Sequence, residues 1–457
     1  MKIGSSHRNL PTAGYWYVSH EIRPVINTKC FYKIMKKKIR TVAIVGGGPS
    51  GCALATLLKR KGFKVGVFYL EKRPEIIVGE SLVPAIVPML RELGVEEEVK
   101  NYSTYKPGAS VWVNKDEEAT SPFSFGGGSL PPYAYNVPRV KFDKTIFDNA
   151  VKEGVQFFKF AAKIEQVNGS DTLKLSDDTI AAINDYFEGQ PDLIVDATGR
   201  SRTISRMLNI PTRQGYRKDV ALFAHLSGAE KIYPYNIHLH RLEKGWTWRI
   251  PLPDRISVGV VINPEHLKNY GSTKEEQYDN YLKSDETLKK FTANAKRETT
   301  VMQYDNYQLI SDYMYGPNWV LTGDAGGFLD PIFSSGLFLA IKGAFRLAKT
   351  IEIGTDAAFK QYQKEQMREL RVWQKLVDTW YSGRLFTLFK VGQDRMDTAF
   401  GRFIGPHMQK HLTRIFTGEA VYRSYSRSFL NFVTGSMIDL MKVGRLHNRK
   451  VADLEIK

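Results

Sequence analysis

Trp246 and Trp248, two tryptophans separated by a single residue, are the most informative residues for the chemistry of a possible site. In an extended segment, residues two apart project from the same face, so the two indoles would form a flat aromatic wall. Asp254 follows, and the alternating run at 256–260 predicts the next strand, so this segment is expected to be one arm of a hairpin. The alternative is that both tryptophans are ordinary core residues, since aromatic side chains dominate protein cores.

A glycine pattern near the start of the chain predicts a dinucleotide site. Gly46, Gly48 and Gly51 form G-x-G-x-x-G between a β-branched apolar run at 41–45 and a helix-forming run at 52–60. The first glycine permits a tight turn, the second lets the backbone approach a pyrophosphate, and the third lets helix and strand pack closely. The helix N-terminus adds free N–H groups and the positive end of its dipole. The expected cofactor-binding residues here are Gly46, Gly48, Pro49, Ser50 and Gly51.

An acidic residue follows at the distance that such sites use. Residues 64–70 are predicted to form the second strand, and Glu71 lies about twenty residues beyond Gly51. A carboxylate in this place accepts hydrogen bonds from ribose hydroxyls. The alternative is a solvated glutamate at the end of a strand.

A second segment of small residues distinguishes FAD from NAD. The run 318–327 predicts a buried strand that ends in Gly323 and Asp324, where the carboxylate can accept a ribitol hydroxyl. This segment resembles the G-D motif of the group A flavin monooxygenase superfamily, and Asp196 to Gly199 and the Val-Pro-Arg string ending at Arg139 resemble two of its further motifs. The resemblance implies FAD, held in part by Arg139, Gly323 and Asp324.

The tryptophan pair belongs to a more specific pattern. The segment 246–251 reads W-x-W-x-I-P and resembles the signature of flavin-dependent halogenases. The resemblance implies an α/β fold, with a Rossmann-type FAD-binding domain like that of p-hydroxybenzoate hydroxylase, a β-sheet substrate layer and a C-terminal helical region. It also implies a wall that keeps substrate away from the oxidant formed at the flavin. The expected wall residues are Trp246, Trp248, Ile250, Pro251 and Phe333.

The segment 330–336, D-P-I-F-S-S-G, precedes a predicted helix at 337–347. Serine and glycine at a helix N-terminus leave N–H groups that suit a small anion. The halogenase resemblance implies chloride or bromide beside the flavin, with Ser335 and Gly336 as the candidate positions. The alternative is a serine cap that packs this helix against the flavin, as in relatives that do not halogenate.

A lysine should lie between flavin and substrate, because halogenases of this family use one to hold or carry the electrophilic halogen. Lys106, in K-P-G-A before an alternating aromatic run and after Gly79-Glu80-Ser81, resembles that lysine. Its ammonium can donate to hypohalous acid, or its amine can be halogenated if desolvation lowers the pKa. By itself, a Lys-Pro-Gly string is more often a turn.

The resemblance implies an oxidoreductase of secondary metabolism that uses FADH2, O2 and halide to form hypohalous acid, which then halogenates an electron-rich carbon. Tryptophan halogenases carry a glutamate just before the serine pair, where this chain has Phe333. That difference favours a phenol, resorcinol or pyrrole over tryptophan. The rival hypotheses are a flavin-dependent aromatic hydroxylase and a geranylgeranyl-reductase-like flavoenzyme.

The expected organisation places an N-terminal extension at 1–37, disordered or mis-annotated, before a discontinuous FAD-binding domain at 38–350. The inserted substrate-side sheet is expected at about 107–139 and 206–314, and a helical region at 351–457. Apolar residues from Phe359 to Trp380 recur at three- and four-residue steps, which predicts an amphipathic helix over the active site.

Composition limits the partners. The net charge is +17, but the basic residues are spread and no nucleic-acid module accompanies them, so no nucleic acid is expected. Cys30 and Cys52 offer neither a disulfide framework nor a metal cluster, and no run of eighteen apolar residues predicts a membrane span, so a cytoplasmic enzyme is expected. No NAD(P)H site is recognisable, so we expect a separate NAD(P)H flavin reductase. The aromatic substrate is free or presented by an acidic carrier protein.

Overall fold

The computed structural model describes residues 38–71, 75–113, 118–214, 218–242, 245–305, 308–395 and 397–438. The predicted N-terminal extension at 1–37, Cys30 within it, and the end of the chain after 438 lie outside the described residues. Among the described helices, none is long and apolar enough to cross a membrane.

A five-stranded parallel sheet forms the first layer, in the order β19-β10-β1-β2-β7. The strands are β1 (Thr41–Val45), β2 (Lys64–Phe68), β7 (Gln156–Phe158), β10 (Leu193–Asp196) and β19 (Trp319–Leu321). Their buried, β-branched runs are typical of a parallel sheet covered on both faces. Because the carboxyl ends of parallel strands meet at one edge, residues that follow β1, β10 and β19 come together although they are far apart in sequence.

Helix α1 (Pro49–Arg60) packs against β1 and β2 of this sheet and lies beside both α4 (Arg139–Lys152) and α10 (Ser335–Ile353). Helix α1 begins with a proline, whose missing N–H costs nothing at a helix start, and it buries Cys52, Ala53 and Leu54. Contacts of α1 with both α4 and α10 join the early and late parts of the chain. The helices around the parallel sheet therefore come from both early and late parts of the chain.

An eight-stranded sheet forms the second layer, in the order β16-β12-β15-β14-β13-β4-β5, with β17 also paired to β12. Strands β14 (Gly245–Pro251) and β15 (Ile256–Ile262) pair antiparallel from Gly245 opposite Ile262 to Pro251 opposite Ile256, which confirms the predicted hairpin. The other strands are β4 (Gly108–Trp112), β5 (Glu118–Pro122), β12 (Val220–Ser227), β13 (Ile237–Arg241), β16 (Lys296–Arg297) and β17 (Met302–Asp305).

The segment from Lys106 to Trp112 is divided between two sheets. Strand β3 (Thr104–Lys106) pairs with β6 (Ala134–Asn136) in a separate two-stranded sheet, whereas β4 joins the large sheet. Pro107 lies at the break, and a proline cannot donate to a strand ladder. Lys106 therefore lies in the small two-stranded sheet, two residues before the large sheet begins at Gly108, and not within the large sheet.

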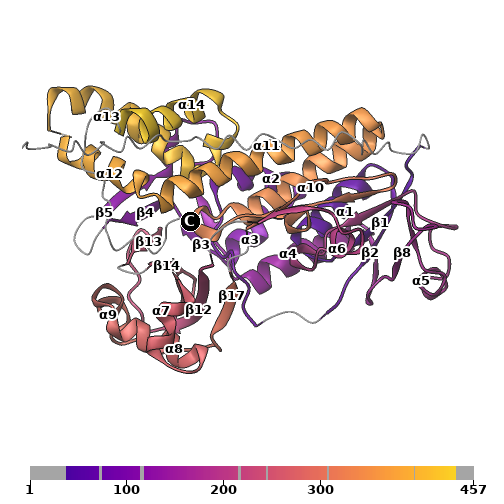
Figure 1. Cartoon of the computed structure of the whole chain (residues 1–457), viewed down its shortest axis with the longest axis horizontal. Helices are drawn as coiled ribbons and strands as arrows, with labels where there is room; N and C mark the ends of the chain where they lie inside the picture. The colour runs from indigo at the N-terminus through magenta and orange to yellow at the C-terminus, as the bar shows by residue number, and fades with distance from the viewer. Residues whose placement is uncertain are drawn as a thin grey trace, which may run out of the picture. The chain divides into compact units, whose positions relative to one another are not determined.

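Helices cover the large sheet. Helices α7 (Pro264–Leu267), α8 (Lys274–Ser284) and α9 (Glu286–Thr292) gather near β12, and the C-terminal helices are α11 (Asp356–Tyr381), α12 (Arg384–Arg395), α13 (Ala399–Thr417) and α14 (Ser424–Phe432) (Figure 1). Helix α11 buries Phe359, Tyr362, Trp373 and Trp380, the apolar face predicted from the sequence, and it lies along α10. Helix α13 packs on the short helix η2 (Phe123–Gly126).

The remaining described elements are short connections around these two layers: α2 (Val87–Leu93), α3 (Glu96–Asn101), β8 (Ile164–Gln166), β9 (Leu173–Leu175), α5 (Asp177–Ala182), α6 (Thr203–Met207), β11 (Thr212–Gln214), β18 (Leu309–Ser311) and β20 (Gly327–Phe328).

Candidate active site

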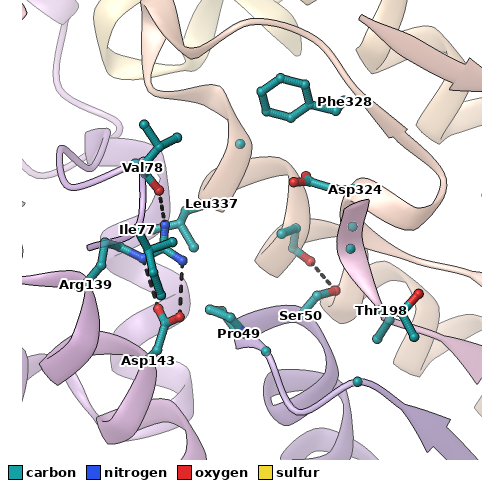
Figure 2. A pocket seen from close by; sticks show the side chains of 18 of the residues that line it. Pro49, Ser50, Ile77, Val78, Arg139, Asp143, Thr198, Asp324, Phe328 and Leu337 are labelled. Carbon is teal, nitrogen blue, oxygen red and sulfur yellow. Dashed lines mark hydrogen bonds and ion pairs between the residues drawn. The ribbon is translucent and has the colours of Figure 1, made fainter. Parts of the chain in front are cut away.

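A cavity of about 600 Å³ is lined on one side by the turns that follow the parallel strands and on another by the tryptophan-bearing strand β14. Further lining residues come from segment 77–81, the start of α4, strand β13 and segment 322–340. Figure 2 shows part of this lining, with Pro49, Ser50, Arg139 and Asp324 around the same space. The glycine-rich turn and the tryptophan pair, which are about 200 residues apart in sequence, thus face one cavity.

The three motif glycines each meet a distinct steric demand. A Cβ at Gly46, where φ is +120°, would lie 2.2 Å from the carbonyl oxygen of Ala197, and a Cβ at Gly51 would lie 2.0 Å from the carbonyl oxygen of Gly46. A Cβ at Gly48 would meet no atom within 4 Å, and Gly48 lines the cavity. The first and third glycines therefore permit close packing within the protein, while the second leaves open space at the N-terminus of α1. That open cradle fits the pyrophosphate of a dinucleotide.

The Gly-Asp motif lies on the same cavity. Gly323 has a φ of +60°, and both Gly323 and Asp324 line the cavity after β19. Desolvation raises the pKa of the Asp324 carboxyl to about 6, against the opposing effect of the Arg139 and Arg200 charges. Among the described residues, no cation is hydrogen-bonded to the Asp324 carboxylate, which beside open space fits an acceptor for ligand hydroxyls.

Arg139 is the first residue of α4 and is held on two sides. Its Nε and Nη2 donate to the two carboxylate oxygens of Asp143 at 2.9 and 3.2 Å, and Nη1 donates to the carbonyl oxygen of Val78 (Figure 2). Arg139, Asp143 and Val78 all line the cavity. The guanidinium is therefore fixed at the wall where the predicted flavin site lies.

Glu71 is the one predicted cofactor residue whose side chain points elsewhere. It does not line the cavity; its carboxylate pairs with Lys159, and 73% of the side chain is exposed. Tyr69 and Leu70 line the cavity just after β2. The ribose-binding role of Glu71 stays a prediction.

The predicted halide segment forms a tight turn into α10. Asp330 caps the short helix η6 (Pro331–Phe333) through a hydrogen bond from the Ile332 amide at 3.0 Å, and Ser334 has a left-handed φ of +56°. Ser334 and Gly336 line the cavity, whereas Ser335 is buried at the first residue of α10. A Cβ at Gly336 would meet no atom within 4 Å. The open space needed for a small anion thus lies at Gly336.

The tryptophan wall, Trp246 and Trp248, has its two ring centroids 5.7 Å apart, and both residues line the cavity with Ile250. Each indole N–H is bonded. Trp246 Nε1 donates to Tyr381 Oη at 2.8 Å, and Trp248 Nε1 is 3.3 Å from Ser257 Oγ. Side chains on two other elements, α11 and β15, thus orient the wall.

Two predicted wall residues lie outside the cavity lining. Pro251 ends β14 and does not line the cavity. Phe333 is buried and packs its ring against those of Trp373, Trp380 and Phe416, on the side of the C-terminal helices. This geometry does not test their predicted role at the wall. Phe333 lies behind the residues that line the cavity.

Lys106 is a buried lysine, with 2% of its surface exposed. Its Nζ donates to Ser81 Oγ at 2.8 Å and to the carbonyl oxygen of Leu82 at 2.7 Å, and it lies 5.3 Å from the centroid of the Phe123 ring. Burial lowers the pKa of the Lys106 ammonium to about 7. Lys106 does not line the cavity, but its partner Ser81 does.

Sequence reasoning missed several residues that organise this site. Tyr381 bonds Trp246 and also donates to Asp330 Oδ2 at 3.2 Å, which links the wall to the halide segment. Glu80 lines the cavity and is 2.7 Å from His225 Nε2. Only Glu80 carried a signal, because it adjoins Ser81 in the Gly-Glu-Ser string; Tyr381 and His225 occur in no recognisable pattern.

The parallel sheet, the glycine cradle and the Gly-Asp motif define an FAD-binding flavoprotein with a second, eight-stranded sheet. Residues 41–131 and 126–400 match the tryptophan halogenase family. The chain therefore belongs to this family of flavin-dependent halogenases, which use FAD.

The relatives agree with this assignment, and solved flavoprotein structures share the fold. The flavin-dependent halogenase armH3 of Armillaria mellea is 31% identical over 338 residues, covering 68% of this chain and 66% of that protein, so the chain spans about two thirds of that relative. The 1H-pyrrole-2-carbonyl-(peptidyl-carrier protein) chlorinase of Pseudomonas fluorescens is 26% identical over 76% of this chain and 85% of its own length. A flavoprotein/dehydrogenase structure from Cytophaga hutchinsonii has a TM-score of 0.75 at 26% identity, covering 88% of this chain and 98% of its own. The flavin-dependent brominase Bmp2 shares the fold, with a TM-score of 0.67 at 23% identity over 85% of this chain and 98% of its own.

Proposed function

We propose that this protein is an FADH2-dependent halogenase that uses O2 and chloride or bromide to halogenate an electron-rich aromatic compound by electrophilic substitution. The proposal rests on the environment of Lys106, a buried amine with a pKa of about 7. Its Nζ donates to Ser81, and Ser81 lines the cavity that the FAD motifs and the tryptophan wall also line. Among the described residues, no carboxylate forms an ion pair with Lys106.

The residues that would hold FAD are Gly46, Gly48, Pro49, Ser50, Arg139, Gly323 and Asp324, all of which line the cavity, with Gly51 packing the turn. Bound and reduced, FAD supplies the electrons that activate O2 for oxidation of halide to hypohalous acid. Gly336 and the first turn of α10 offer the halide N–H groups in an open part of the cavity. Trp246 and Trp248 exclude the organic substrate from the flavin side.

Lys106 can act in either protonation state, because a pKa of about 7 populates both near neutral pH. The ammonium can donate a hydrogen bond to the oxygen of hypohalous acid. The amine can instead attack the halogen, so that an N–halogen bond forms, the halogen–oxygen bond breaks, and the hydroxide that leaves takes up one N–H proton to become water. Both routes hold the electrophile on the substrate side of the wall.

The substrate class proposed is a phenol, resorcinol or pyrrole. Phe333 occupies the position before the serine pair, and it offers no carboxylate to assist attack by an indole ring. A relative named for chlorinating a pyrrole on a peptidyl-carrier protein supports a pyrrole, and a carrier-bound substrate, as members of this class. A separate NAD(P)H flavin reductase would supply the reduced flavin.

Mass spectrometry of products tests the proposal. The purified protein is supplied with reduced FAD, O2, bromide or chloride, and a panel of phenols, resorcinols and pyrroles. Products with a halogen isotope pattern support it. A mass gain of one oxygen atom would replace it with the hydroxylase hypothesis, and reduction of an isoprenoid double bond without any halogenation would favour the reductase-like alternative.

A further inference from the structure

Three buried polar side chains lie on the face of the eight-stranded sheet opposite the tryptophan wall. Trp248 and Ile250 line the cavity from one face of β14, so Arg249, between them, projects from the other face. His238 of β13 is directly opposite Arg249, and His240 follows two residues later on the same face. Arg249 and His238 are each 2% exposed, and His240 is 0% exposed. This far-face cluster, Arg249, His238 and His240, is therefore enclosed by protein and separate from the predicted FAD site.

Arg249 stays charged, but the two ends of its guanidinium lack acceptors. Its Nε donates to His240 Nε2 at 3.1 Å, and its Cζ lies 3.4 Å from the centroid of the Phe291 ring on α9. Burial lowers the pKa of the guanidinium to about 10, against the opposing effect of the Glu118 and Glu230 charges, so the group is protonated at neutral pH. Nη1 and Nη2 are buried without a hydrogen-bond partner among the described residues. A buried charge with unmade hydrogen bonds destabilises a fold strongly unless it is compensated.

His238 offers a further N–H group from the neighbouring strand. The Trp112 indole N–H, which can only donate, lies 3.2 Å from His238 Nδ1, so Nδ1 accepts and the proton of the imidazole is on Nε2. Burial and the Arg249 charge lower the pKa of His238 to about 3, so the ring is neutral. Within the described part of the chain, His238 Nε2 is also buried without a partner. Because directly opposite residues have Cβ atoms about 5 Å apart, Arg249 and His238 present their unpartnered N–H groups in the same region.

The unpartnered nitrogens of the far-face cluster are all donors. Because Arg249 Nε donates to His240 Nε2, the proton of that ring is on Nδ1, which likewise has no partner among the described residues. Only an acceptor can satisfy such a set, and an anion also compensates the charge of Arg249. The cluster is almost fully buried and Phe291 covers one face of the guanidinium, so a ligand with bulky substituents could not be enclosed. A monatomic anion fits these conditions.

We propose that the far-face cluster binds one halide ion, chloride or bromide, held by the Nη groups of Arg249 and by Nε2 of His238. The site lies across β14 from the cavity, so it is distinct from the halide position proposed at Gly336. Its ligand compensates the charge of Arg249, the residue after Trp248, and so stabilises the strand that carries the tryptophan wall. The inference does not rest on the halogenase proposal, because it uses none of the residues assigned to FAD, to the wall or to catalysis.

Bromide serves as the probe, because its X-ray absorption edge marks its position in a crystal. Crystals of the protein soaked in sodium bromide should show an anomalous difference peak within hydrogen-bonding distance of Arg249 Nη and His238 Nε2. Crystals of Arg249→Met treated in the same way should lack this peak and keep any peak at Gly336. A wild-type crystal with no anomalous peak at the far-face cluster, or with a water molecule in its place, would overturn the inference.

Unfolding in solution tests whether the ion binds outside a crystal. Denaturant unfolding is measured in sodium bromide and in sodium gluconate at constant ionic strength. If bromide binds only the folded protein, each tenfold rise in bromide above its dissociation constant raises the ratio of folded to unfolded protein about tenfold. Arg249→Met should lose this factor, while any bromide bound at Gly336 contributes equally to both proteins. In gluconate alone, Arg249→Met should be at least as stable as the wild type, since it removes an uncompensated buried charge.

Two further variants separate this site from a general effect of salt. His238→Asn keeps an oxygen that accepts from the Trp112 indole but lacks the N–H at Nε2, so about tenfold more bromide should be needed for the same stabilisation; it also serves if Arg249→Met fails to fold. Arg255→Gln is the matched control, because it removes one positive charge beside β15, where Arg255 pairs with the exposed Asp254. Bromide should stabilise this control as much as the wild type. Equal stabilisation of the wild type, Arg249→Met and His238→Asn would overturn the inference and leave the halogenase proposal intact.

Discussion

At the scale of single residues, the most consequential feature is a lysine whose charge is opposed by burial. Lys106 makes its hydrogen bonds to a hydroxyl and a carbonyl, both neutral acceptors. Desolvation therefore outweighs these bonds and lowers the pKa of the ammonium to about 7. The chemistry proposed for this residue follows from that balance.

This balance predicts how stability depends on pH. Between pH 7 and about 10.5, the folded protein releases the Lys106 proton while the unfolded chain still binds it, so the free energy of unfolding rises with pH by up to about 1.4 kcal/mol per pH unit. Lys106→Met lacks this contribution, so its stability relative to the wild type should be highest at or below pH 7 and should decline toward pH 10. Denaturant unfolding of both proteins from pH 6 to 10 measures the difference. A constant difference would show that Lys106 titrates normally.

Two glycines of one motif should fail in different ways. Gly48→Ala adds a methyl group to open space at the cradle, so it should weaken FAD binding, by tenfold or more, with little change in the stability of the apoprotein. Gly51→Ala would place its Cβ 2.0 Å from a carbonyl oxygen, so it should destabilise the fold itself, on the order of 1–3 kcal/mol. Flavin titration and thermal unfolding of each apoprotein check the pair. Equal losses of stability would remove the functional distinction between the two glycines.

At the scale of elements, the tryptophan wall depends on hydrogen bonds that no local pattern encodes. Strand β14 could be predicted from sequence, because its alternation is local. The contact of Trp246 with Tyr381 spans 135 residues and that of Glu80 with His225 spans 145, so neither leaves a sequence signal. The break between β3 and β4 at Pro107 could have been predicted from the missing N–H of proline, but which sheet each strand joins depends on tertiary pairing.

We expect substitutions in the tryptophan wall to reduce the share of the oxidant that halogenates the substrate. Trp246→Phe, Trp248→Phe and Tyr381→Phe should bind FAD normally but should yield less halogenated product per flavin oxidised, because the barrier becomes smaller or loses its anchor. Tyr381→Phe should also cost about 1–3 kcal/mol of stability, since it leaves the buried Trp246 N–H without its partner. Product and peroxide are measured together for each variant. Ratios equal to the wild type in all three would reduce the motif to a structural marker of the family.

At the scale of the whole molecule, an FAD cradle assembled from distant segments and a substrate-side sheet share one cavity. The α/β class and the FAD motifs were predictable, because glycine turns carry steric demands that the sequence states directly. Two positions could not be predicted: Phe333 lies behind the residues that line the cavity, and the Glu71 side chain points away from the cavity. Both depend on how helices and side chains pack around the FAD motifs.

This organisation predicts a two-component system. Since no NAD(P)H site was recognised in the sequence, the purified protein with FAD should oxidise NADH only at the uncatalysed rate, and halogenation should start when a flavin reductase is added. The measurement is NADH absorbance with and without the reductase. Rapid NADH oxidation by the protein alone, coupled to halogenated product, would contradict this prediction.

The most direct test of the central claim is the product yield of Lys106→Ala and of Lys106→Met, which better preserves the buried volume, with reduced FAD, O2, bromide and an electron-rich phenol. The account predicts normal FAD binding and flavin oxidation with no brominated product in either variant, because the oxidant forms but is not held on the substrate side. Undiminished bromination in folded, FAD-bound Lys106→Met would contradict it.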